Sequence, residues 1–196
     1  EKSAKDFQHV MRGLKYKKYG QIIKDWETFL DKPPPDTATA ANAMLPVIEL
    51  ARSRIYKKFR GIVKNGNKIL ATTEDELLHA LRIECKKLRY LMEFFANLFP
   101  RKKINALIAQ LKNLQDNLGD FNDLCVQQEY LLNIATELDS GRQQLQKTLV
   151  AIGSLVEALN GEKKAVRDAF AETFGNFSAP ANQALFKELF ASKTSN

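Results

Sequence analysis

Apolar residues recur every three or four positions along most of this chain, which is the spacing of one face of an α-helix. The clearest example is the set of leucines and isoleucines at positions 104, 107, 111, 114 and 118. The pattern predicts helices over residues 4–30, 39–64, 74–98, 102–118, 122–138, 143–159 and 162–174, and a short helix after residue 180. No segment shows the pattern of a strand. The predicted fold is therefore all-α, an antiparallel helical bundle with long amphipathic helices.

Prolines, glycines and small polar residues determine where these helices are predicted to end. The proline-rich segment KPPPDT (32–37) ends the first helix, and NGNK (65–68) is expected to form a turn. A threonine of TTEDE (72–76) is expected to cap the next helix, with acidic residues in its first turn. Gly119 and Gly161 are expected to separate later helices.

The composition is that of a soluble globular protein, with 44% apolar and 27% charged residues in 196. We predict one helical domain, residues 1–196. No apolar run approaches the ~20 residues that a membrane span needs. Cys85 and Cys125 have neither metal-site spacing nor the density of a disulfide scaffold, so a reducing, cytoplasmic location is expected.

Positive charge is concentrated in the first part of the chain. Residues 1–112 hold 23 Lys and Arg against 12 Asp and Glu, a net charge of +11, whereas residues 113–196 have a net charge of −4. A basic region joined to a mildly acidic one predicts a positively charged surface, which favours polyanionic partners.

One stretch, HALRIECKKLRYLMEFF (79–95), divides its cations and its apolar residues between two sides of a helix. At about 100° per residue, four side chains form a stripe about 80° wide and about 15 Å long. These are His79, Arg82, Lys86 and Arg89. The opposite side is apolar and holds Leu77, Leu81, Cys85, Leu88, Met92 and Phe95. Only Glu93 is acidic beside the stripe, and we expect it to pair with Arg89.

The preceding helix repeats the same interval. Arg54, Lys57, Gly61 and Lys64 have the spacing of the first stripe, with Lys58 at its border, and Lys112 flanks the apolar side of a later helix. Guanidinium and ammonium groups bind phosphate oxygens. A stripe of them along a helix matches a linear chain of phosphates better than one compact anion.

The segments that carry these cations resemble the CHAD family, the conserved histidine α-helical domains. The family pattern is a histidine, an arginine three residues later and a K/R-x-L-R-Y segment, which ELLHALRIECKKLRYLMEFFANLF (76–99) matches. LKNLQDNLGDFNDL (111–124) resembles the following family segment, and KYKKYGQIIKDWETFL (15–30) the end of the first half of such domains.

The resemblance implies a helical domain that binds inorganic polyphosphate along a basic surface, without catalysis, cofactor or metal. It assigns binding roles to His79, Arg82, Lys86 and Arg89, and then to Lys87, Arg54, Lys57, Lys58 and Lys112. Such domains are pseudo-repeats with a histidine helix in each half, and the first is missing here: residues 1–31 resemble the end of the first half and 39–196 the second. A homodimer, or a separate N-terminal half, is therefore an expected partner.

Two other functions are compatible with the same cations. One is a helical interaction scaffold for an acidic protein or RNA, although only Tyr90 accompanies the stripe for base stacking. The other is a phosphate-ester hydrolase, which would need acids beside the stripe to hold Mg²⁺. Asp116, Asp120 and Asp123 have a suitable spacing only on a continuous helix, so we interpret them as helix caps.

Overall fold

The computed structural model of the protein describes residues 7–8, 17–33, 42, 44–72, 74–138 and 145–191. It divides into two compact units, Glu1–Leu45 and Pro46–Asn196. Every regular element among the described residues is helical, and they include no strand, which confirms the predicted all-α fold. The assignment of residues 1–196 to one functional domain stays a prediction.

The first unit contains one long helix in its described part, α2 (Lys17–Asp31). Its apolar side chains are exposed, including Ile22 and Trp26, and the ring of Trp26 stacks on Phe29 with 5.6 Å between centroids. The predicted helix began at residue 4, but among residues 4–16 only 7–8 are described, and these are helical.

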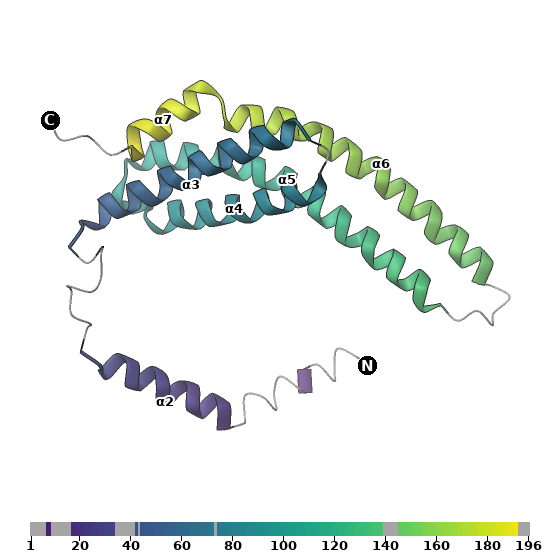
Figure 1. Ribbon diagram of the computed structural model, residues 1–196, viewed down its shortest axis with the longest axis horizontal. Coiled ribbons are helices and arrows are strands. Elements are labelled where there is room, and N and C mark those ends of the chain that lie inside the picture. The colour runs from purple at the N-terminus through teal and green to yellow at the C-terminus, as the bar shows by residue number, and fades with distance from the viewer. Residues whose placement is uncertain are drawn as a thin grey trace. The chain divides into compact units, whose positions relative to one another are not determined.

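The second unit is a helical bundle (Figure 1). Its elements are α3 (Val47–Leu70), α4 (Asp75–Phe94), the short 3₁₀ helix η2 (Ala96–Leu98), α5 (Arg101–Glu137), α6 (Leu145–Phe177) and α7 (Pro180–Phe190). Helix α4 packs between α3 and α5, while α3 also contacts α7 and α5 pairs along its length with α6. Figure 1 shows α5 and α6 continuing together beyond the other helices as a two-helix hairpin.

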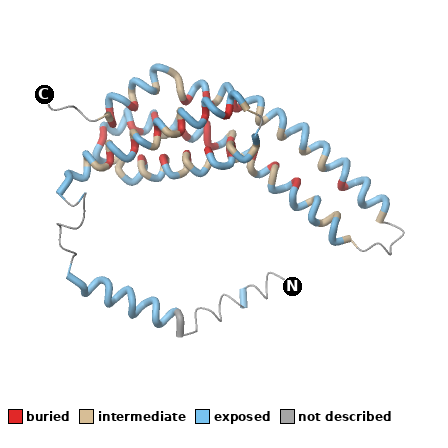
Figure 2. The backbone as a smooth tube through the Cα atoms, viewed as in Figure 1, coloured by how far each residue is buried: buried red, intermediate tan, exposed pale blue. Residues whose placement is uncertain are grey.

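The core lies where all these helices overlap, and Figure 2 shows few buried residues in the projecting hairpin. Aromatic rings join α3, α6 and α7: Phe59 stacks on Phe186 at 3.8 Å between centroids, and Phe177 meets Phe59 edge-on. Aliphatic side chains fill the space between α4 and α5, where Leu88 and Leu111 are fully buried. This core fixes the rotation of α4, and with it the direction of its cations.

Several predicted helix ends are wrong. Helix α5 is continuous through Gly119 and Asn122, and α6 is continuous through Gly161. A glycine in a helix interior costs only about 1 kcal/mol relative to alanine. Around Gly119 the buried side chains of Leu118 and Phe121 continue the apolar face of α5, so packing on both sides of the glycine keeps the helix intact.

The NGNK segment is likewise part of α3 and not a turn, because α3 runs from Val47, directly after Pro46, to Leu70. Gly66 is buried and faces α6: a Cβ placed on it would lie 2.0 Å from Cε2 of Phe174. The glycine therefore permits a close approach of α3 to α6. The predicted second helix began at residue 39, and residues 39–41 lie outside the described part of the chain.

The start of α4 also differs from the prediction. Its N-cap is Glu74, which makes no side-chain capping hydrogen bond, although Asp75 lies in the first turn as expected. Arg167 of α6 holds this end of the helix instead, since it donates to the Thr72 carbonyl at 2.9 Å and to the Asp75 carboxylate at 3.0 Å. A contact from another helix thus replaces the expected threonine cap.

We expect Gly66→Ala to destabilise the protein by about 1–3 kcal/mol, because the new methyl group would overlap the ring of Phe174 in a packed core. Gly161→Ala is the matched control: its Cβ would meet nothing within 4 Å, so it should stabilise α6 by about 0.5–1 kcal/mol. Urea unfolding of the two variants measures both effects. Changes of the same sign would contradict the close helix approach at Gly66.

Candidate functional site

Helix α4 has the two opposed faces that the sequence predicts. Leu81, Cys85, Leu88 and Met92 are at most 1% exposed and form part of the core. The other side carries His79, Arg82, Lys86 and Arg89, which we call the α4 stripe. His79 is exposed and its three companions are half-buried. The burial of one face therefore directs the cations away from the core.

The three half-buried cations line a cleft of about 450 Å³ between α4 and α5, which we call the α4/α5 cleft. Its α4 wall is formed by Arg82, Lys86, Arg89 and Tyr90. Its α5 wall is formed by Gln115, Asp116, Gly119, Asp120 and Asp123. The cleft thus has a cationic wall and a wall of one amide and three carboxylates.

No ion pair joins the two walls in the described structure. Arg89 instead approaches Glu93 on its own helix, with 3.7 Å between Nε and Oε1, which confirms the predicted local pair. The guanidinium of Arg89 also lies over the ring of Tyr90, 5.4 Å from its centroid. The charges of Arg82 and Lys86 therefore have no counter-charge in contact within the described residues.

His79 connects the same two helices at one end of the stripe. Its Nδ1 lies 2.7 Å from Oδ1 of Asn122 on α5. An amide oxygen only accepts hydrogen bonds, so Nδ1–H is the donor. This leaves Nε2 as the ring nitrogen for a ligand, and it fixes the imidazole at the mouth of the space between α4 and α5.

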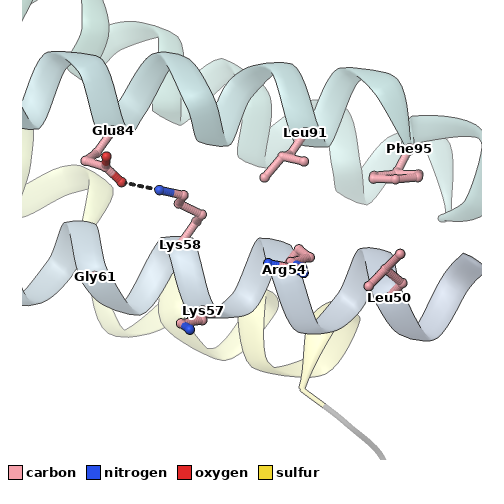
Figure 3. Close-up of a pocket in the computed structure, with 8 residues that line it drawn as sticks. All are labelled: Leu50, Arg54, Lys57, Lys58, Gly61, Glu84, Leu91 and Phe95. Atoms are coloured by element: carbon pink, nitrogen blue, oxygen red, sulfur yellow. Dashed lines mark hydrogen bonds and ion pairs between the residues drawn. The ribbon is translucent and has the colours of Figure 1, made fainter. Parts of the chain in front are cut away.

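The second basic stripe consists of Arg54, Lys57, Gly61 and Lys64 on α3, and all but Lys64 line a groove of about 680 Å³ between α3 and α4 (Figure 3). Helix α3 contributes Leu50, Arg54, Lys57, Lys58 and Gly61, and α4 contributes Glu84, Leu91 and Phe95. Figure 3 shows Lys58 reaching across to Glu84, while the apolar side chains lie toward the other end. The two stripes therefore line different depressions: the first lines the α4/α5 cleft and the second borders the α3/α4 groove.

Glu84 neutralises two of the predicted binding residues. Its carboxylate lies 2.5 Å from Nζ of Lys58 and 3.2 Å from Nζ of Lys87. The hydrogen bond from Lys58, with help from Lys87, lowers the pKa of Glu84 below its ordinary value, and burial opposes this effect. Both lysines are thus partly compensated, unlike the cations of the α4/α5 cleft.

The remaining predicted residue, Lys112, is exposed on α5 and lines neither depression. The sequence pattern did not indicate Arg60, which lines a smaller groove of about 420 Å³ between α3 and α7 together with Lys57 and Lys64. It also did not select Gln115. Residues 115, 119 and 122 have the spacing of one face of a continuous helix. This spacing was the signal in the sequence that could have indicated Gln115 as a residue of the site.

The three aspartates are not helix caps, because α5 is continuous through all of them. All three line the α4/α5 cleft, opposite the stripe. They do not form a metal centre by themselves: the described residues include no group of three or more His, Cys, Asp or Glu side chains that could hold an ion. The carboxylates are therefore part of the cleft wall.

The described structure supports a core role for Cys85. Its thiol is buried, and burial raises its pKa to about 12, with a smaller effect from Glu84. Cys125 is half-buried on α5, and both cysteines are free. The nucleophile in thiol alkylation is the thiolate.

We expect iodoacetamide to modify Cys125 of the native protein well before Cys85, because Cys85 is both covered and protonated at neutral pH. In urea the two should react at similar rates. Mass spectrometry of labelled peptides measures this order. Equal labelling rates in the native protein would show that α4 does not bury its cysteine.

A comparison with protein families finds that the CHAD domain model matches residues 1–132. The chain belongs to the CHAD family. The match covers all of α3 and α4 and most of α5, so both walls of the α4/α5 cleft are CHAD elements, whereas α6 and α7 lie beyond it. No curated protein matches the chain. Among the described helices, none combines the length and the apolar character that a membrane crossing requires.

Proposed function

We propose that this CHAD protein binds inorganic polyphosphate along the α4 stripe. The observation that carries the proposal is the α4/α5 cleft, where Arg82, Lys86 and Arg89 line one wall without an ion-pair partner on the other. Charge-assisted hydrogen bonds from arginine and lysine are strong contacts to phosphate oxygens. Family membership supports the same ligand class.

The geometry favours an extended ligand. Arg82 and Arg89 are seven residues apart, about 10 Å along the helix axis, and His79 extends the stripe by a further turn. One phosphate group does not reach cations over this length, whereas a chain of phosphates does. Of the α3 residues, Arg54 and Lys57 are the better candidates for additional contacts, because Lys58 and Lys87 share Glu84.

The proposed role is binding without catalysis, in the absence of any cofactor. The two competing functions have distinct signatures. An interaction scaffold for RNA or an acidic protein would use the same cations without preference for polyphosphate. A hydrolase would use the aspartates of the α5 wall, with a metal brought by the substrate, to cleave phosphate esters or anhydrides.

A competition experiment at one fixed salt concentration distinguishes these functions. The protein is titrated with long-chain polyphosphate, a single-stranded RNA of equal charge and ATP, with Mg²⁺ present and released orthophosphate measured. We expect polyphosphate to bind most tightly and to remain intact. Equal affinity for RNA would favour the scaffold, and phosphate release would favour the hydrolase.

A second copy of the chain is the proposed protein partner. On one face of α4, Ile83, Tyr90 and Phe94 are 39%, 53% and 80% exposed, with the charged side chain of Lys87 among them. Large apolar side chains exposed on one helix face favour a partner, and self-association through a two-fold axis is the commonest arrangement. Light scattering over a concentration series tests this, and a monomer at every concentration would contradict it. A separate N-terminal half as partner, and a cytoplasmic location, remain predictions.

A further inference from the structure

Gln115 is the one amide in the wall of the α4/α5 cleft, and its environment is unusual. The residue is only 8% exposed, and its Nε2 has no hydrogen-bond partner in the described structure. Leaving a buried amide donor unpaired is unfavourable, and such groups are uncommon in folded proteins. The cleft that contains this donor is also lined by Arg82, Lys86 and Arg89. A ligand that binds there and accepts a hydrogen bond from Gln115 therefore explains why the donor is unpaired in the free protein.

The opposite wall presents a second donor of the same kind. Nε of Arg89 is buried and without a hydrogen-bond partner, since the 3.7 Å that separate it from the Glu93 carboxylate are too long for a hydrogen bond. One donor comes from α4 and the other from α5. Both are N–H groups, so the partner that suits them is an acceptor oxygen and not a cation.

We propose that a phosphoryl group of the ligand binds in the α4/α5 cleft and accepts hydrogen bonds from Nε2 of Gln115 and Nε of Arg89, with Arg82 and Lys86 supplying positive charge. This inference rests on the proposed polyphosphate-binding function. It adds a defined position for one phosphoryl group and a neutral residue that recognises it.

The ligand has to displace part of the cleft wall to reach this position. Both nitrogens are covered in the free protein, and the side chain of Arg89, 25% exposed, is the long and flexible group at this point. Binding of a phosphoryl group therefore includes an outward movement of the Arg89 guanidinium and exposure of the Gln115 amide to the cleft. The carboxylates of Asp116 and Asp120 on the same wall limit how much negative charge can enter. The position between Gln115 and Arg89 consequently suits one phosphoryl group, while neighbouring groups of the same chain lie along Arg82 and Lys86.

Removing a neutral donor and removing a cation change the salt dependence of the binding affinity differently. Removing Lys or Arg reduces the number of counterions released on binding and so flattens the salt dependence. Removing the Gln115 amide removes a hydrogen bond without changing the charge, so affinity should fall by the same factor at every salt concentration.

The test is Gln115→Met in the full chain, which keeps the length of the side chain and removes the donor. We expect the Kd for polyphosphate of about 100 units to rise about tenfold, as the loss of one hydrogen bond to a charged group predicts, at both 50 and 200 mM salt. Pyrophosphate should lose affinity by a similar factor. The melting temperature of the free protein should stay the same or rise, because an unpaired buried donor is gone. Gln127→Met is the matched control, since Gln127 is exposed on the same helix, and it should change neither property.

Three results would overturn the inference, and they are distinguishable. If Gln115→Met binds polyphosphate as tightly as the wild type, the amide is not a ligand residue and the proposed function stands without it. If the free variant melts at a lower temperature, Gln115 is paired in the free protein, with its amide turned so that Oε1 accepts from Arg89. If the wild-type protein does not bind polyphosphate at all, the proposed function fails first.

Discussion

We expect the combined substitution Arg82→Ala, Lys86→Ala and Arg89→Ala to weaken polyphosphate binding about a thousandfold. These three side chains form the cationic wall of the α4/α5 cleft, and the described structure shows no ion pair from them to the opposite wall. At about 1.5 kcal/mol for each lost hydrogen bond to a charged phosphate oxygen, their sum of about 4.5 kcal/mol corresponds to roughly three orders of magnitude in Kd. Fluorescence or calorimetric titration of the variant measures the change.

The matched control removes the same total charge from exposed cations outside the cleft. Lys68→Ala, Lys102→Ala and Lys147→Ala together lower the net charge by three, on α3, α5 and α6. We expect this variant to lose only a few-fold in affinity through the weaker overall field. A similar loss in both triple variants would show that net charge, and not the α4 stripe, determines binding.

Leu88→Ala should destabilise the protein by about 2–5 kcal/mol, which is the range for a leucine removed from a packed core. Leu88 is fully buried and lies on the core face of α4, one residue before Arg89. At a temperature where the variant remains folded, its polyphosphate affinity should be close to that of the wild type, because no residue of the cleft is changed. Urea unfolding and a binding titration on the same sample measure the two effects.

Leu155→Ala is the control for this substitution, because Leu155 is 54% exposed in the hairpin formed by α5 and α6. Its effect on the free energy of unfolding should stay within about 0.5 kcal/mol. If Leu88→Ala were equally mild, the assignment of the core face of α4 would be wrong, and with it the direction of the stripe.

The sequence was most informative where one helix has two chemically distinct sides. The period of the apolar residues in α4 predicted both the buried face and the cationic face, because a helix that packs on a core has only one rotation that buries Leu81, Cys85 and Leu88 together. The pairing of Arg89 with Glu93 followed from their spacing alone.

The helix ends were less predictable, because glycine and asparagine act as breakers only when tertiary packing does not oppose them. Gly66 lies in α3 where the helix meets Phe174 of α6, a contact between residues more than a hundred positions apart. Local composition contains no information about that neighbour. Gly119 similarly lies between buried residues of α5, and Gly161 lies in α6 between the buried side chains of Ile152 and Phe170.

The composition of the cleft was only half predictable for the same reason. The sequence identified the cations of one wall, since they belong to one helix. The opposite wall with Gln115, Asp116 and Asp120 became apparent only when α5 was seen to be continuous and adjacent to α4. The same expectation that Gly119 ends a helix led us to interpret the aspartates as caps.

The salt dependence of polyphosphate binding tests the central claim most directly, when it is measured in parallel for the wild type and for the triple variant of Arg82, Lys86 and Arg89. For the wild type, the logarithm of the binding constant should fall steeply and linearly with the logarithm of the salt concentration. For the variant, the magnitude of the slope should be smaller by roughly two, since each of three lost phosphate contacts contributes about 0.7 on a single-stranded polyanion. Identical slopes and affinities for the two proteins would contradict binding along the α4 stripe.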